Sequence, residues 1–169
     1  MKPQILVFGY GNPARGDDAL GPLLLEQLEA RRANDWLQAI ELECLTDFQL
    51  QIEHALDMPG RDQVIFVDAH TRCPPPCTLE PLQPCADHSY TSHALTPAAL
   101  LQVFRDIHPA RELPPCFLLS IRGYRFELGD PLSPQAEAHL SAALQQLEQH
   151  IRQQVVQADP PADPYCLSV

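Results

Sequence analysis

The fold is decided by the stretch ILVFGYGNPARGDDALG, which spans residues 5–21. Its first four residues form a continuous apolar run that Gly9 closes, and such a run predicts a short strand buried on both faces. Apolar residues at near-helical spacing follow over residues 20–32. The stretch therefore predicts a buried strand, a tight glycine turn and a helix, which together form the opening unit of a parallel α/β sheet.

The rest of the chain repeats this alternation of strands and helices. Further strands are predicted at 39–45, at 64–68, at 116–121 and, as a short piece at most, at 78–82. Further helices are predicted at 48–56, at 96–107 and at 133–157. Thr96 and Ser133 are the predicted N-caps of the last two helices, because each precedes a proline that fits the first helical position.

This alternation predicts one α/β domain over residues 1–157, with a mostly parallel sheet covered by helices on both faces. Glutamates alternate with apolar residues over 39–45, so that strand is predicted at an edge of the sheet. Residues 158–169 contain several prolines and are predicted to form a flexible tail.

Composition narrows the classes of function. Lys and Arg number 11 against 22 Asp and Glu, a net charge of -11. A nucleic-acid-binding protein needs a basic face, so no nucleic-acid partner is expected. The chain has no long apolar run for a membrane span and no signal peptide at its start, so we expect a cytoplasmic protein without a membrane partner. Nothing in the sequence specifies an oligomeric state, and a monomer is the simplest expectation.

Three residues are candidates for a divalent metal site: Asp18, Asp68 and His93. Asp18 follows the first strand, and Asp68 ends the strand at 64–68, whose carboxyl end faces the ligand crevice in open α/β sheets. In the common strand order 2-1-3-4-5, the first and third strands are neighbours, so the two carboxylates converge and His93 reaches in from a later loop. Two carboxylates and an imidazole form an open metal shell. The alternative is structural: capping by Asp17, Asp18 or Asp68, and a solvated loop histidine.

Two other ligand sites compete with this interpretation. A dinucleotide site would need a third glycine at position 14, which is Ala14, and the acids of the turn would repel a pyrophosphate. A structural zinc site would use the thiols of the proline-rich loop, with His70 or His88 as the fourth ligand. Those thiols belong to Cys73, Cys77 and Cys85. Their spacing is loose, so the zinc site is the weaker hypothesis.

Four motifs resemble those of the nickel-iron hydrogenase maturation endopeptidases, in the same order along the chain. They are residues 5–12 with 16–21, residues 65–69, residues 92–95, and Gly123 with 129–134. The resemblance implies a three-layer α/β/α sandwich with a twisted, flavodoxin- or phosphorylase-like sheet. It also implies that Asp18, Asp68 and His93 contact nickel.

The resemblance further implies the reaction: hydrolysis of one peptide bond, which removes the C-terminal extension of a hydrogenase large-subunit precursor. Nickel is expected to arrive with that precursor. Residues 46–54 lack the glycines found there in many family members. Their sequence resembles more closely that of the proteases for soluble NAD-reducing hydrogenases. The alternative function is a non-enzymatic nickel-binding assembly chaperone, which would use the same acids and histidine.

Overall fold

The structure is a computed structural model, and it describes residues 1–86 and 95–158. Its centre is a five-stranded sheet with the strand order β2-β1-β3-β5-β4. The strands are β1 (Gln4–Tyr10), β2 (Glu41–Asp47), β3 (Gln63–His70), β4 (Cys77–Pro81) and β5 (Cys116–Arg122). Four of them run parallel, and β4 pairs with β5 in the antiparallel direction. The predicted mostly parallel α/β sheet is therefore confirmed.

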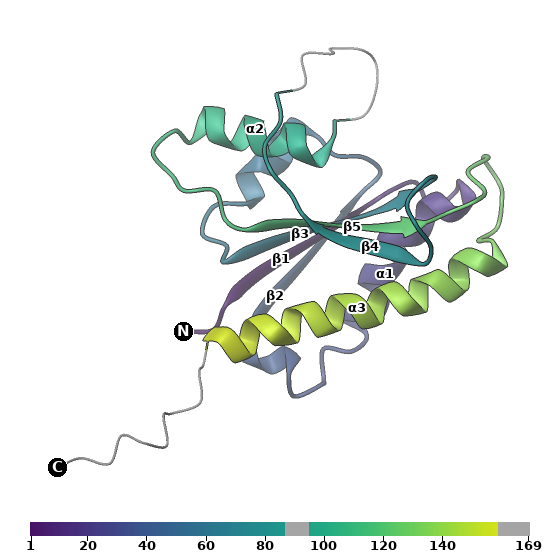
Figure 1. Ribbon diagram of the computed structural model, residues 1–169, viewed down its shortest axis with the longest axis horizontal. Helices are drawn as coiled ribbons and strands as arrows, with labels where there is room; N and C mark the ends of the chain where they lie inside the picture. Colours follow the sequence, from purple (N-terminus) through teal and green to yellow (C-terminus); the bar gives the residue numbers. More distant parts are fainter. Residues whose placement is uncertain (87–94, 159–169) are drawn as a thin grey trace.

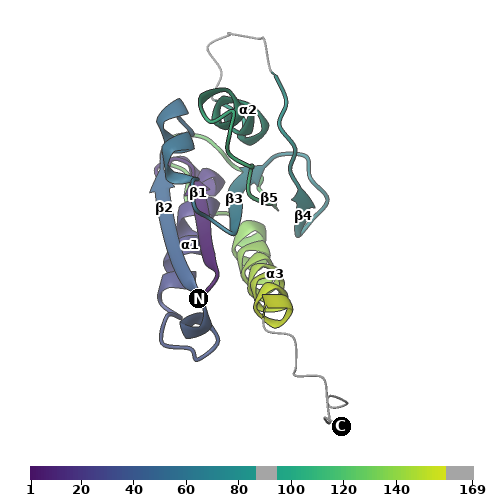
Figure 2. The same cartoon turned by 90° about the vertical axis from the view of Figure 1, so that its left-hand side faces the viewer.

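Helices cover both faces of the sheet, as predicted. Figures 1 and 2 show α1 (Leu20–Glu29) and α3 (Pro134–Ala158) on one side, and α2 (Pro97–Ile107) with the 3-10 helix η3 (Ile52–Asp57) on the other. The predicted caps are present: the Thr96 hydroxyl accepts a hydrogen bond from Ala99 N, and the Ser133 hydroxyl accepts one from Ala136 N, each 3.2 Å long. No helix in the described part of the chain has the length and apolarity needed to cross a bilayer.

The central strands divide their side chains between two cores. Ile5 and Val7 of β1 pack with α1 and α3, whereas Leu6, Phe8 and Tyr10 pack on the side of α2. This period of two explains why the apolar run at the start of the sequence is buried on both faces. The same alternation along β3 puts Asp68 on the face of Val64 and Phe66, the α2 side of the sheet.

The strand order differs from the predicted 2-1-3-4-5 in its last two members. The adjacency of β1 and β3 is confirmed, but β5 lies next to β3, and β4 is the outer strand. The physical reason lies in the two sequences. The strand β4 ends in Pro81, and a proline is tolerated in a sheet mainly at its edge, whereas the apolar β5 suits a central position. The prediction of an α-helix at 48–56 was wrong, since only the shorter 3-10 helix η3 forms there.

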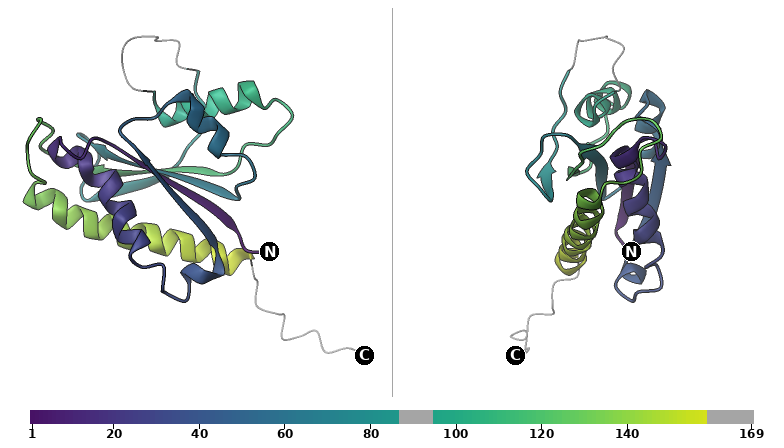
Figure 3. Two further views of the ribbon diagram at one scale, coloured as in Figure 1. Left: turned by 180° about the vertical axis from the view of Figure 1, so that it is seen from behind. Right: turned by 90° about the vertical axis from the view of Figure 1, so that its right-hand side faces the viewer.

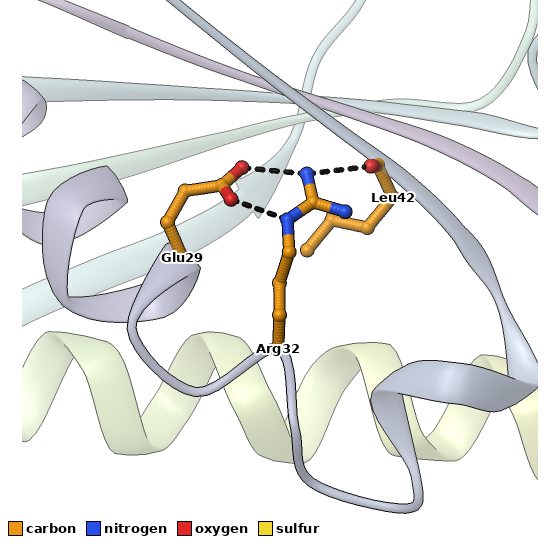
Figure 4. Close-up of polar contacts among 3 residues, drawn as sticks. All are labelled: Glu29, Arg32 and Leu42. Atoms are coloured by element: carbon orange, nitrogen blue, oxygen red, sulfur yellow. Dashed lines mark hydrogen bonds and ion pairs between the residues drawn. The ribbon is translucent and has the colours of Figure 1, made fainter.

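The strand β2 lies at the opposite edge, as its alternating glutamates predicted. Figure 4 shows how the chain after α1 is fastened to this edge. The Arg32 guanidinium donates to the Leu42 carbonyl over 3.0 Å and forms an ion pair with both carboxylate oxygens of Glu29. The Arg32 side chain, which comes from the segment after α1, occupies a carbonyl of the edge strand β2, so this contact covers part of the edge while it positions the connection.

Candidate functional site

Asp18 sits just beyond the carboxyl end of β1, in the short 3-10 helix η1 (Gly16–Ala19). Its carboxylate accepts a hydrogen bond from the backbone N–H of Asn12 over 2.7 Å, which folds the turn back onto it. Gly11 makes this approach possible. Its φ is +149°, and a Cβ atom there would lie 1.9 Å from the Asp18 carbonyl oxygen. Asp18 does not cap α1, whose first turn has no side-chain cap.

Asp68 lies beside Tyr10 at the carboxyl ends of β3 and β1. The parallel register pairs Gly9 with Val67, so Tyr10 and Asp68 are the next residues along the two strands and share the α2 face. The Tyr10 hydroxyl lies close enough to the Asp68 carboxylate for hydrogen bonding between them to raise the pKa of Tyr10 and lower that of Asp68. Asp18 is close enough for its charge to act on both groups. The structure thus brings two of the three predicted site residues together.

The surroundings of Asp68 disfavour a second negative charge beside that of Asp18. Burial, as the largest cause, raises the pKa of Asp68 from its usual range to about 7. The hydrogen bond from Tyr10 lowers that pKa, the charge of Asp18 raises it, and the backbone N–H of Ala69 lowers it again. Burial and the Asp68 carboxylate likewise raise the pKa of Tyr10, so its hydroxyl stays protonated and remains a donor. Asp68 is therefore an acid that exchanges its proton near neutral pH.

The third predicted residue, His93, lies outside the described residues. Leu95, two residues further along the chain, packs partly buried against the core on the α2 side, the side that Tyr10 and Asp68 share. Within residues 1–86 and 95–158, no group of three or more His, Cys, Asp or Glu side chains is placed to hold a metal ion. The role of His93 as a third ligand stays a prediction.

Asp17, predicted only as a capping candidate, joins two distant segments. It is fully buried, and its carboxylate accepts hydrogen bonds from the backbone N–H groups of Tyr124, Arg125 and Ser133 and from the Ser133 hydroxyl. Its own N–H donates to the Arg125 carbonyl over 2.7 Å. Figure 3 shows the result: the start of α1 lies beside the loop that leads into α3. The adjacent acids at 17 and 18 therefore have different tasks, one inside the fold and one at the site.

The fold matches that of endopeptidases of known structure. The hydrogenase maturating endopeptidase HybD from Escherichia coli is 26% identical, with a TM-score of 0.69 over 89% of this chain and 93% of its own. An endopeptidase from Escherichia coli, solved in solution, is 28% identical, with a TM-score of 0.67 over the same shares of the two chains. The chain is a structural relative of the hydrogenase maturation endopeptidases.

A more distant neighbour supports the fold alone. The hydrogenase maturation protease HycI from Thermococcus kodakarensis is 18% identical, with a TM-score of 0.66 over 90% of this chain and 94% of its own. No protein-family model matches the sequence, and no curated protein matches it. These structures confirm the predicted fold class. The two structures from Escherichia coli also confirm the resemblance to hydrogenase maturation endopeptidases and the assignment as a peptide-bond hydrolase. The narrower NAD-reducing subtype stays a prediction.

The described residues of this endopeptidase relative support neither the zinc site nor the dinucleotide site. The Cys73 thiol donates to the Ser120 carbonyl, the Cys77 thiol contacts the Gln146 side chain over 3.1 Å, and Cys85 is exposed. These thiols do not form a metal cluster among the described residues, and His88 lies outside them. In the glycine turn, the Asn12 N–H that a phosphate would need already binds the Asp18 carboxylate. The turn therefore supports an acidic site in place of a nucleotide site.

Proposed function

We propose that the chain is an endopeptidase that removes the C-terminal extension of a nickel-loaded hydrogenase large-subunit precursor. In this proposal Asp18, Asp68 and His93 bind the nickel that the precursor carries. One observation carries it: Asp18 and Asp68 lie together at the carboxyl ends of adjacent strands, in a chain whose structural relatives are hydrogenase maturation endopeptidases.

A bound cation would stabilise the ionised forms of Asp18 and Asp68. Asp68 has a pKa of about 7, because burial and then the nearby Asp18 charge disfavour its ionised form. A divalent ion beside both carboxylates would favour their ionised forms and displace the proton of Asp68. The substrate's nickel would therefore supply the charge that the pair lacks, and a precursor without nickel would bind poorly.

Two divisions of labour at the scissile peptide bond fit these residues. In the first, nickel polarises the carbonyl or acidifies a bound water. In the second, nickel only positions the bond, and a carboxylate such as Asp18 or Asp68 acts as the general base. That carboxylate would then take a proton from the water that adds to the carbonyl carbon and return it to the departing amine. Both routes give the same products, a new carboxyl end and a free amine.

Thiol catalysis has no support in the described part of the chain. Burial raises the pKa of Cys73, Cys77 and Cys116, so these thiols stay protonated at neutral pH. A catalytic cysteine needs a lowered pKa, since the thiolate is the nucleophile. Hydrolysis by an activated water is the chemistry that the site residues favour.

The partner in this proposal is a protein, and residues 46–54 offer it an apolar surface near the site. The family resemblance implies that this segment shapes substrate specificity. Phe48 is 68% exposed and Ile52 is 59% exposed, so this segment presents two large apolar side chains to a partner. We expect the reaction to take place in the cytoplasm and to require a single copy of the chain.

The test is to incubate the full chain with purified large-subunit precursors, with and without nickel, and to measure the mass of the large subunit. We expect a loss of mass only for the nickel-loaded precursor of the partner hydrogenase. An unchanged mass for every nickel-loaded precursor would overturn the proposal. If the isolated chain then bound nickel tightly and stoichiometrically, the non-enzymatic nickel carrier would be the better assignment.

A further inference from the structure

Tyr10 is a buried phenol at the site whose hydroxyl has one evident task. It ends β1, is 8% exposed, and packs its ring near Phe8, with the ring centroids 6.2 Å apart. The ring contributes to the core on the α2 side of the sheet, as a phenylalanine would. The hydroxyl adds nothing to that packing, and burying it without a partner would cost free energy. The Asp68 carboxylate, on the adjacent strand, lies within hydrogen-bonding reach of this hydroxyl.

We infer that Tyr10 is a positioning residue for the reaction: its hydroxyl holds one oxygen of the Asp68 carboxylate, which leaves the other oxygen for the substrate's metal ion. This inference rests on the proposed function, because it assigns Tyr10 a role toward a ligand of that site. Tyr10 touches neither the substrate nor the metal in this account. It acts only through Asp68.

The need for such a residue follows from the chemistry of the acids. A carboxylate can rotate about its last bond and bind a cation through either oxygen or both, so a metal ligand is normally oriented by a hydrogen bond from a neighbouring group. Asp68 is under the repulsion of Asp18, which would favour turning it away. A neutral donor on the adjacent strand counters that tendency without adding a charge.

The adjacency of the two strands makes the donor rigid. Gly9 and Val67 are paired in the parallel β1–β3 register, and Tyr10 and Asp68 are the next residue on each strand. Both side chains point to the same face of the sheet. The Phe8 ring, on the same face of β1, lies beside the phenol with the ring centroids 6.2 Å apart. Because a site on packed strands is held more tightly than one on loops, loss of the hydroxyl is expected to affect Asp68 more than it affects the fold.

The test compares Tyr10→Phe with the wild type and with Tyr124→Phe. Tyr124 is an exposed tyrosine on the loop after β5, so it controls for loss of a hydroxyl as such. The first readout is kcat and KM for cleavage of nickel-loaded precursor. The second is a titration of the labelled, isolated chain with Ni²⁺ alone, in which paramagnetic broadening of the Asp68 and Ala69 amide signals reports binding. Unfolding in urea is measured for each variant.

We expect Tyr10→Phe to lower kcat/KM and the apparent Ni²⁺ affinity by roughly 10- to 100-fold, with Tyr124→Phe unchanged. Lowered stability with a wild-type response to Ni²⁺ would mean a structural role only and would overturn the inference. Weaker Ni²⁺ binding by Tyr10→Phe, in a chain that cleaves no precursor, would support the positioning role and reject the endopeptidase. Equal Ni²⁺ binding and equal cleavage by the variant and the wild type would reject the positioning role alone.

Discussion

Ser133 donates two hydrogen bonds to the carboxylate of Asp17, one from its backbone N–H and one from its hydroxyl, and both are 2.7 Å long. The same hydroxyl accepts from Ala136 N and so caps α3. One serine thus connects the first turn of the longest helix to the segment that carries Asp18. The geometry of the site depends on a buried acid that takes no part in the chemistry.

The first prediction concerns this contact. Asp17→Asn removes the charge and replaces one of the two accepting oxygens with an NH₂ group that faces donors, so buried donor groups lose their partner. The free energy of unfolding is expected to fall by about 3 kcal/mol, a typical cost for a buried charged acceptor. Urea unfolding at pH 7 measures it.

The control for that prediction is Asp106→Asn, because Asp106 is exposed and, among the described residues, accepts a side-chain hydrogen bond from Gln102 alone, four residues away on the same helix. It should change the free energy of unfolding by less than about 0.5 kcal/mol. Equal stability of the two variants would show that Asp17 is not the anchor described above.

The second prediction concerns Asp68 and pH. Its pKa is raised from 3.8 to about 7 in the folded state, so the folded protein holds this proton more tightly than the unfolded chain. Well below pH 3.8, the usual pKa, both states are protonated and nothing is lost. As the pH rises from 4 to 7, the unfolded chain ionises freely and the folded state is penalised, by at most about 4 kcal/mol above pH 7.

Asp68→Asn removes that penalty while it keeps an oxygen for the Tyr10 hydroxyl. The variant should therefore be more stable than the wild type at pH 8 and equally stable at about pH 3, as measured by urea unfolding at both values. A gain of the same size at both pH values would mean that packing, and not ionisation, is responsible. The variant is also expected to lose peptidase activity, so it would exchange function for stability.

Much of this arrangement was predictable from local sequence patterns, because those patterns record burial. The apolar run at 5–8 gave β1, the alternating glutamates gave the edge strand β2, and the residues Thr96 and Ser133 gave the helix starts. Periodicity does not encode which strands become neighbours, so the exchange of β4 and β5 was missed. Pro81 was the available signal, since it favours an edge position.

The candidate site was predictable only in part, for a related reason. Asp18 and Asp68 stand out because acids at the ends of apolar strands face the crevice of an α/β sheet. The partners of Asp17 lie more than 100 residues away in sequence, so no local pattern announces that this acid is buried. The contact between Tyr10 and Asp68 depends on the β1–β3 register, which the individual strands do not specify.

The third prediction concerns the turn between β1 and η1. Gly11→Ala would bring a Cβ atom to 1.9 Å from the Asp18 carbonyl oxygen, so the backbone of the turn must move. The free energy of unfolding is expected to fall by about 3 kcal/mol or more, because backbone strain and displacement of the turn both destabilise the folded state. Gly60→Ala is the control. Gly60 has a φ of +79° but no atom within 4 Å of an added Cβ, so it should cost only about 1 kcal/mol.

That comparison separates a steric effect from a conformational one. If Gly11→Ala and Gly60→Ala lost the same stability, the close approach of the turn to Asp18 would be wrong. Nuclear magnetic resonance adds a direct check, since the Asn12 amide signal should move in the Gly11 variant and stay in place in the Gly60 variant. The Asn12 N–H binds the Asp18 carboxylate, so this signal reports the position of the acid.

The last prediction concerns the proposed ligands themselves. Asp18→Ala, Asp68→Ala and His93→Ala are each expected to abolish cleavage of the nickel-loaded precursor, because the remaining two groups bind the metal too weakly to position the scissile bond. Their circular dichroism spectra should match that of the wild type.

The matched controls are Asp106→Ala and His108→Ala. Asp106 is an exposed acid in the last turn of α2, and His108 is the histidine that directly follows this helix. Both controls should process precursor at the wild-type rate. Complete cleavage by any one of the three site variants would remove that residue from the site, and cleavage by all three would mean that the acids at the ends of β1 and β3 do not select the substrate.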